Sequence, residues 1–498
     1  MSKRPFSGIE CLSSRSVTAP LSTWDMRPET NEKPPMPPLP KAAGCGNPIR
    51  WVFDSCSDCD TCRFLMDESC LMFPELFRLY DRSCEKRQQP DDAALRRLTD
   101  LCTFCGLCPC PDIRTGILNA KAAYVRQEGL SLDARLLSDV QRIGLLCGLA
   151  PSLLQRLRKG LIENALKSRI GIDPNRRLPP IPSRHFFSWA KREGLDRPVD
   201  HSPKVAYFAG CTAGYFFPEI AMSAVAVLQR SGIAVHVPEQ QCCGMPLLLE
   251  GDQTTALKRM QFNLNTLLGL VRLGYTPVCS CPTCGYVLKV LLQQGACYSE
   301  LYQRHIQAGT NEILVPDRQP GKSGFVSLKK SMYENILIDD GLFSVLDPVG
   351  RMELAAQVED VGEYLLGRIS ENDPASGTCL PHRRMVYFAP CHQREQGIGS
   401  PYETLLSRIP GLSILRVGGA MDCCGMGGSL GFKQGFSERS IALGERLFAD
   451  IQKTAPDAIV TDCISCRLQF EHTLPYPVFH PLQVLAITTE SPPSKNSG

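Results

Sequence analysis

The sequence predicts an α/β protein in which a mostly helical N-terminal domain precedes two similar β-α-β-α-β units. One observation is a group of five cysteines that occurs twice, with nearly the same spacing, in the second half of the chain. In both copies, short apolar runs alternate with longer segments of helical periodicity, and each cysteine group follows an apolar run. Two compact cysteine arrays, separated by helical sequence, precede these copies.

Composition narrows the class of protein. The 498 residues are enough for about three domains of ~150 residues each. A net charge of +3 argues against a general nucleic-acid binder. No apolar run approaches the ~20 residues of a membrane helix, and no export signal is visible, so a cytoplasmic protein is expected. The 25 cysteines, an odd number in a long chain, favour metal binding over disulfide bonds.

Residues 1–50 are predicted to be a disordered, proline-rich tail, in which Cys11 and Cys45 bind nothing. Residues 51–129 contain two C-x2-C-x2-C arrays, each with a further cysteine, and a helix is expected at residues 90–101 between them. The cysteines are Cys56, Cys59, Cys62 and Cys70 in the first array, and Cys102, Cys105, Cys108 and Cys110 in the second.

Both arrays resemble the bacterial ferredoxin run C-x2-C-x2-C-x3-C-P, in which three close cysteines bind one [4Fe–4S] cluster and the fourth ligates the other. The fourth cysteine comes late in the first array and early in the second, which departs from that run. By analogy, Cys110 completes the first cluster and Cys70 the second, with Cys84 as a substitute. Structural zinc is the competing interpretation, although zinc typically uses two separated C-x-x-C pairs.

Residues 130–203 are predicted to form a helical, basic connector. Its leucines recur at helical spacing, which is interrupted at Pro151. Residues 141–197 contain 12 Lys or Arg and only 4 Asp or Glu. Such a stretch can bind an anionic membrane surface or an acidic redox partner. The alternative is a linker whose leucines pack on the domains while its arginines remain solvated.

Residues 204–300 form the first five-cysteine unit. The expected strands are 205–209, 233–237 and 276–280, and the expected helices are 219–232 and 252–273. Its cysteines are Cys211, Cys242, Cys243, Cys281 and Cys284. Each cysteine group follows a strand, and a parallel sheet brings the carboxyl ends of its strands to one edge, where such sheets bind ligands. Distant cysteines are therefore expected to converge.

Residues 301–384 are expected to be a helical linker, with a helix at 352–369. Cys297, just before this linker, and Cys379 within it are expected to be ordinary thiols. Residues 385–486 repeat the unit, with strands at 385–389, 413–417 and 458–461, and residues 487–498 are expected to be a polar tail. The second set of cysteines is Cys391, Cys423, Cys424, Cys463 and Cys466. The two units are predicted to face each other across a pseudo-twofold axis.

The repeated signature C-x30/31-C-C-G-x36/37-C-x-x-C resembles the cysteine-rich CCG domain in the B and D components of heterodisulfide reductase. Two ferredoxin-type arrays ahead of two such domains also resemble the glycolate oxidase iron–sulfur subunit and the C component of anaerobic glycerol-3-phosphate dehydrogenase. Residues 171–180 of the connector look most like the latter. The resemblance implies two [4Fe–4S] clusters in the N-terminal domain and one or two more, cubane or noncubane, in the CCG domains. The role of Cys279 is left open.

The resemblance further implies an iron–sulfur electron-transfer subunit of an oxidoreductase complex. It would relay electrons between a flavoprotein dehydrogenase subunit and a quinone or other acceptor, at the inner face of the membrane and without nucleic acid. One alternative is a heterodisulfide reductase-like catalyst, in which His392 either donates a proton or is a surface histidine or one that only supports its neighbour. The other is a redox sensor or scaffold. Because no G-x-G-x-x-G follows a strand, a flavin or nicotinamide is expected on another subunit.

Overall fold

The computed structural model describes residues 47–157, 161–317, 324–333, 339, 341–368 and 381–488. The predicted N-terminal tail up to residue 46, Cys379 and the predicted C-terminal tail from residue 489 lie outside these residues. Both predicted tail boundaries need a small correction. Ile49 is buried and helix α1 begins at Arg50, while helix α24 (Pro481–Thr488) continues into the expected C-terminal tail.

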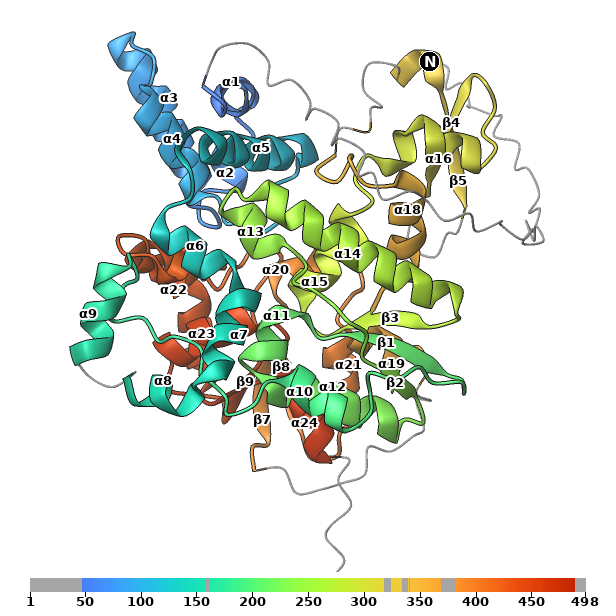
Figure 1. Ribbon diagram of the computed structural model, residues 1–498. Helices are drawn as coiled ribbons and strands as arrows, with labels where there is room; N and C mark the ends of the chain where they lie inside the picture. Colours follow the sequence, from blue (N-terminus) through green and yellow to red (C-terminus); the bar gives the residue numbers. More distant parts are fainter. Residues whose placement is uncertain are drawn as a thin grey trace, which may run out of the picture. The chain divides into compact units, whose positions relative to one another are not determined.

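The N-terminal part is helical, as expected (Figure 1). Its helices are α1 (Arg50–Cys59), α2 (Cys62–Leu65), α3 (Met72–Lys86), α4 (Asp92–Leu101) and α5 (Pro111–Glu128). They share a core that includes Val52, Leu76 and Ile117. Helix α4 agrees with the helix expected at residues 90–101. It begins there because the Asp91 carboxylate accepts a hydrogen bond from the Ala94 N–H at 2.7 Å.

The connector is also helical. It contains α6 (Leu132–Ser138), α7 (Val140–Leu149), α8 (Pro151–Leu157), α9 (Leu161–Arg169) and α10 (Phe186–Arg192). The break between α7 and α8 falls at Pro151, because proline lacks the N–H that would continue the helix. Leu145, Leu146 and Leu149 on α7 are exposed, so these leucines do not pack on the domains.

The first parallel sheet contains the three expected strands, β1 (Lys204–Phe208), β2 (Ala234–His236) and β3 (Thr276–Cys279). Its helices are α11 (Gly210–Tyr215), α12 (Pro218–Arg230), α13 (Met245–Leu249), α14 (Gln253–Arg272) and α15 (Pro282–Gly285). A π-helix (Tyr286–Leu291) continues from α15, and a 3-10 turn (Ala296–Tyr298) leads to α16 (Glu300–His305). The expected order of strands and helices is therefore confirmed for this unit.

The predicted single helix at residues 352–369, within the helical linker, was wrong. Helix α18 (Pro348–Gln357) ends before strand β6 (Glu359–Asp360), which pairs in parallel with β3 and completes the first sheet in the order β2-β1-β3-β6. Asp360 then caps helix α19 (Val361–Leu366) in a capping box with Glu363, which ends the strand and starts a new helix. The same region holds a hairpin of β4 (Glu312–Pro316) and β5 (Phe325–Lys329), followed by α17 (Lys330–Tyr333).

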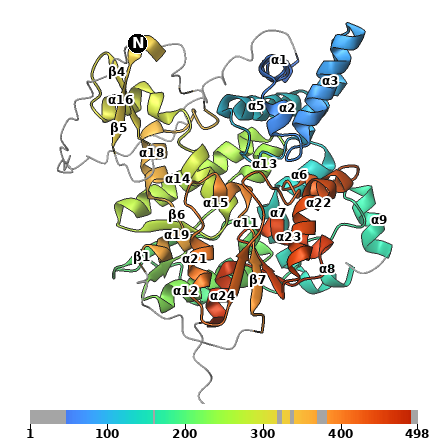
Figure 2. The same ribbon diagram turned by 180° about the vertical axis from the view of Figure 1, so that it is seen from behind.

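The second parallel sheet contains β7 (Arg384–Tyr387), β8 (Ser413–Arg416), β9 (Ala458–Val460) and β10 (Val478–Phe479) (Figure 2). Its helices are α20 (Cys391–Arg394), α21 (Pro401–Ser407), a 3-10 turn (Leu430–Phe432), α22 (Ser437–Thr454), α23 (Ile464–Thr473) and α24. The strand order is β10-β9-β7-β8. When each sheet's strands are counted along the chain, both sheets have the order 2-1-3-4. The pseudo-twofold relation itself stays a prediction.

Candidate metal centres

The cysteines of the two N-terminal arrays form two groups that exchange one member. Burial, together with the nearby thiols of Cys62, Cys110 and Cys59, raises the pKa of Cys56 to about 12. Burial also raises the pKa of Cys62 to about 11, again with Cys110 and Cys59 beside it. Cys110, from the second array, thus lies with the first array's triplet.

The converse holds for the second group. Burial raises the pKa of Cys70, and the nearby thiols of Cys105 and Cys102 also raise it. Burial raises the pKa of Cys108 as well, with Cys102, Cys105 and Cys70 nearby. The structure therefore places the cysteines in the crossed groups that the ferredoxin analogy suggested, while the ligand assignment stays a proposal. The substitute, Cys84, is exposed on α3 beside the Tyr80 hydroxyl.

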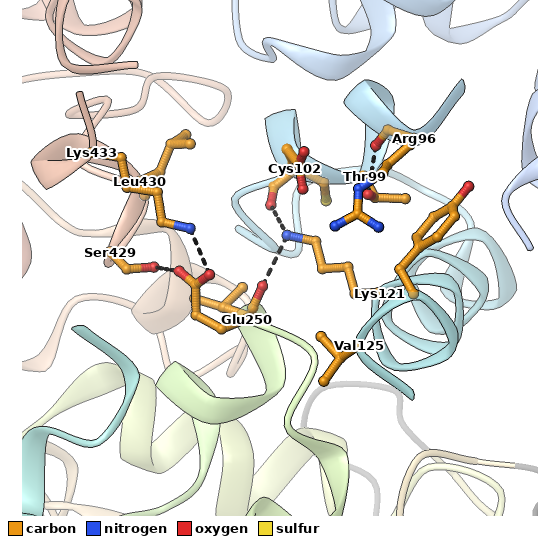
Figure 3. Close-up of a pocket in the computed structure, with 13 residues that line it drawn as sticks. Arg96, Thr99, Cys102, Lys121, Val125, Glu250, Ser429, Leu430 and Lys433 are labelled. Atoms are coloured by element: carbon orange, nitrogen blue, oxygen red, sulfur yellow. Dashed lines mark hydrogen bonds and ion pairs between the residues drawn. The ribbon is translucent and has the colours of Figure 1, made fainter. Parts of the chain in front are cut away.

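Polar contacts fix the second group between both sheet domains (Figure 3). The Lys121 ammonium donates to the carbonyls of Cys102 at 3.1 Å and Leu249 at 3.0 Å. Beside it, Glu250 pairs with Lys433 at 2.6 Å and accepts a hydrogen bond from the Ser429 hydroxyl. These contacts join α5, the end of α13 and the loop before α22.

In the first sheet domain, all five predicted cysteines converge beyond the carboxyl ends of the strands. The Cys242 thiol lies 3.2 Å from the Cys211 sulfur, and that contact, together with burial, raises the pKa of Cys211 well above its ordinary value. Cys243 contacts Cys242 and Cys284, and Cys284 contacts Cys281. We call these five residues site 1. Cys279 faces the Glu359 carbonyl at 3.8 Å within the sheet and lies near Cys281.

The second sheet domain gathers its five cysteines in the same way, and we call them site 2. Cys424 contacts Cys423 and Cys466, and Cys466 also contacts Cys463. Burial raises the pKa of Cys391, and the nearby thiols of Cys105, Cys463 and Cys424 also raise it. Cys105 belongs to the second N-terminal group, so site 2 adjoins that group. The spacing of the motifs gave no sign of this.

A glycine after each cysteine pair permits these turns. Gly244 and Gly425 have φ angles of +91° and +81°, which side chains other than hydrogen rarely tolerate. A β-carbon on Gly425 would also lie 1.9 Å from the Ser440 carbonyl oxygen, so α22 packs directly on this turn.

The donor sets fit iron–sulfur clusters. Burial and neighbouring thiols raise the pKa of three cysteines in each site, whereas hydrogen bonds from neighbouring thiols lower the pKa of Cys242, Cys281 and Cys424. The positive charge of bound irons would favour the thiolate form of the ligands. In the part of the chain that the structure describes, no three Cys, His, Asp or Glu side chains converge as the ligands of a single metal ion would. Each iron of a four-iron cluster takes its own thiolate, so cluster ligands need not converge in that way.

His392 connects three cysteine groups. Its Nε2 lies 2.9 Å from the Phe104 carbonyl and therefore carries the proton, so Nδ1 accepts from the Thr283 hydroxyl at 3.0 Å. The ring stacks on Tyr286 at 4.6 Å. Burial lowers the pKa of His392 to about 4, against the opposing effect of its bond to Phe104. A neutral ring with both nitrogens engaged fits the supporting role and argues against the proton donor.

The connector supports both sites, which its sequence did not reveal. At site 1, the Gln141 side chain on α7 accepts a hydrogen bond from the Cys242 N–H at 2.9 Å, and Asp139 pairs with Arg259 at 2.7 Å. At site 2, the Asp173 N–H donates to the Phe432 carbonyl at 2.8 Å, just after the glycine-rich turn. The connector is therefore part of the site architecture, in addition to joining the domains.

Two parallel sheets, each with a Cys-Cys-Gly turn and a C-x-x-C helix at its carboxyl edge, define a class of cysteine-rich proteins. The Cysteine-rich domain family CCG matches residues 205–289 and 385–471, so the chain contains two CCG domains. These matches cover the ten cysteines of sites 1 and 2.

Among known proteins, the chain is similar to the C component of the anaerobic glycerol-3-phosphate dehydrogenase of Escherichia coli K12, with 26% identity over 65% of this chain and 69% of that protein. It is also similar to the B component of the fumarate reductase (CoM/CoB) of Methanothermobacter marburgensis, with 25% identity over 57% of this chain and 45% of the relative. An uncharacterized iron–sulfur protein of Methanococcus maripaludis is 25% identical over 54% of this chain and 42% of the relative. These relatives support an electron-transfer role in an oxidoreductase.

Replacing Cys110 or Cys70 tests the crossed grouping. Each of Cys110→Ala and Cys70→Ala removes one ligand of one cluster, so the anaerobically purified variant is expected to lose about four irons per chain and one paramagnetic signal. Iron analysis and electron paramagnetic resonance measure both. Cys84→Ala is the control and should retain the full content. Loss of iron in the Cys84 variant, with full content in the other two, would contradict the grouping.

His480 makes stability depend on pH. Its Nε2 donates to the Ser280 carbonyl at 3.1 Å, and burial lowers its pKa to about 4. Because the unfolded pKa is ~6.5, the unfolded chain binds more protons between these values, so stability falls as pH decreases. This residue should contribute a loss of about 1 to 2 kcal/mol between pH 8 and pH 5.5. In thermal unfolding at several pH values, His480→Gln should reduce this dependence, and His305→Gln, at an exposed position, should not. If wild type and His480→Gln show the same dependence of stability on pH, His480 does not make this contribution.

Proposed function

We propose that the chain is the iron–sulfur electron-transfer subunit of an oxidoreductase complex. It relays electrons between a flavoprotein dehydrogenase partner and a quinone or other acceptor. The N-terminal groups hold two [4Fe–4S] clusters, and sites 1 and 2 hold one or two more, cubane or noncubane. The names of the relatives support this proposal, because they include a component of a dehydrogenase, a component of a reductase and an iron–sulfur protein.

The observation that carries the proposal is the continuity of the cysteine groups. Cys108 and Cys110 are separated by one residue yet lie in different N-terminal groups, which keeps those groups close. Cys105 lies near Cys391 and Cys423 of site 2. His392, next to Cys391, bonds to Thr283 between two cysteines of site 1. A relay needs such a chain of neighbours, whereas a sensor or scaffold does not.

The first N-terminal group is placed where a redox partner can approach it. Cys59 and Cys110 are exposed, as are Trp51 and Leu65, and Phe64 is 80% exposed next to Cys62. Exposed apolar side chains gathered at one place typically mark an interaction surface. The flavoprotein subunit is proposed to dock here, so that electrons enter through the first group.

Helix α7 is the proposed contact with a membrane surface. Its exposed leucines lie in the basic connector, and Leu149 is 81% exposed. Apolar side chains beside basic residues bind anionic bilayer surfaces without crossing them. No helix within the described ranges is both long and apolar enough to span a bilayer. The proposed location is therefore peripheral, at the inner face of the cytoplasmic membrane.

Anaerobic purification tests the relay. We expect about 16 irons per chain if each site holds its own cluster, with a matching amount of sulfide. Stepwise reduction followed by electron paramagnetic resonance should show interacting centres. A preparation containing zinc and few irons would overturn the proposal. Reduction of disulfides by the isolated chain with a viologen donor would instead favour the catalytic alternative. If the chain is only a relay, it should show no activity in this assay.

Vesicle flotation tests the membrane contact. The holoprotein should float with vesicles rich in anionic phospholipid and less with neutral ones, because both apolar and electrostatic terms contribute. Replacing Leu149 by Ser is expected to weaken flotation several-fold, and the exposed Leu273→Ser, on the first CCG domain, serves as the control. Flotation that is the same for wild type and Leu149→Ser would refute the contact.

A further inference from the structure

Arg176, in the connector, is a buried cation that the relay does not explain. The residue is 2% exposed, and its guanidinium donates to the Gly431 carbonyl, to Gln469 Oε1 at 2.8 Å and to Ser440 Oγ at 2.9 Å. All three acceptors are uncharged. Within the described part of the chain, no carboxylate lies within ion-pair distance of Arg176, and nearby Asp173 is held by the Asn175 N–H and the Ser437 hydroxyl.

A guanidinium remains charged in a protein, and burying it without an anion is strongly unfavourable. The surroundings of Arg176 show where the balancing charge belongs. Ser440, which accepts from Arg176, donates its own hydroxyl proton to the Gly425 carbonyl at 2.7 Å, directly after Cys424. Cys424 is also close enough to Arg176 to influence its pKa. Asp173 supplies part of the balancing negative charge, and ligated thiolates at site 2 would supply the rest.

Site 1 has a corresponding cation, but its charge is cancelled. Arg259 on α14 lies near Cys242 and Cys211, and its guanidinium forms an ion pair with Asp139 at 2.7 Å. The side chains of this pair are 12% and 20% exposed, so the carboxylate offsets most of the positive charge that site 1 would otherwise feel. Two sites with equivalent cysteines therefore lie in different electrostatic surroundings.

We propose that Arg176 makes the centre at site 2 easier to reduce than the centre at site 1. The proposal rests on the proposed function, in that both sites hold clusters. An electron added to a cluster adds negative charge, which a nearby cation without a direct ion pair stabilises in a low-dielectric interior. Arg176 acts through charge and through its support of the glycine-rich turn, and is a positioning residue. Electrons arriving beside Cys105 then settle first at site 2.

The test is a potentiometric titration of the holoprotein, followed by electron paramagnetic resonance, with iron content measured for every variant. Arg176→Gln should lower the midpoint potential of one centre and leave the others unchanged. Arg176→Lys keeps the charge and should restore most of the wild-type potential. Arg177→Gln is the matched control, because Arg177 is the exposed neighbour and donates to the Glu471 carbonyl at 3.4 Å. It should change no potential.

A second variant tests the same idea at site 1 with the opposite sign. Asp139→Asn removes the charge that cancels Arg259 and preserves an amide oxygen for the start of α7, so it should raise the potential of a different centre. Full iron content with unchanged potentials in Arg176→Gln and Asp139→Asn overturns the inference alone. So does a shift of the same centre in both variants. Wild-type protein without clusters overturns the proposed function instead.

Discussion

The structure depends on one constraint, which is that it holds many thiols in a buried, low-dielectric environment. Each thiol must lose its proton to bind a metal, yet burial and neighbouring sulfurs disfavour the charged form. In each sheet, three parallel strands end near a cysteine group, so the fold brings the thiols together at one edge. It also places arginines behind the thiols, Arg259 at site 1 and Arg176 at site 2. The sheets hold the cysteine groups in place, and the connector contributes the charged residues Arg176 and Asp139 beside them.

The same constraint explains why the domains pack through their sites. Phe104, beside Cys105, lies in the core of the first CCG domain, and its carbonyl accepts a hydrogen bond from His392 of the second. Its φ angle of +52° is strained for a phenylalanine, so the surrounding packing holds it in place. One turn of the N-terminal domain therefore touches both sheet domains. Groups that exchange electrons need such short separations, and this packing supplies them.

Periodicity predicted most of the regular structure and failed at one informative place. The expected strands around Cys211 and Cys391 formed, because apolar runs that are buried on both faces have a clear length and composition. Strand β6 was missed, since two residues between helices carry no periodic signal. Its capping residues, Asp360 and Glu363, were visible in the sequence and would have marked the interruption. The fourth strand exists because β3 offers a free edge, which is a tertiary fact.

The sequence by itself determined the ten cysteines of the CCG domains, their duplication and the order of the domains, because ligand spacing and strand–helix alternation are local properties. The exchange of Cys70 and Cys110 between the N-terminal groups was suggested by analogy, and the packing placed them accordingly. Only the tertiary structure decided which groups adjoin one another, that His392 joins them, and that Arg259 forms an ion pair whereas Arg176 forms none with the residues that the structure describes. These depend on residues more than 100 positions apart, whose contacts follow from packing.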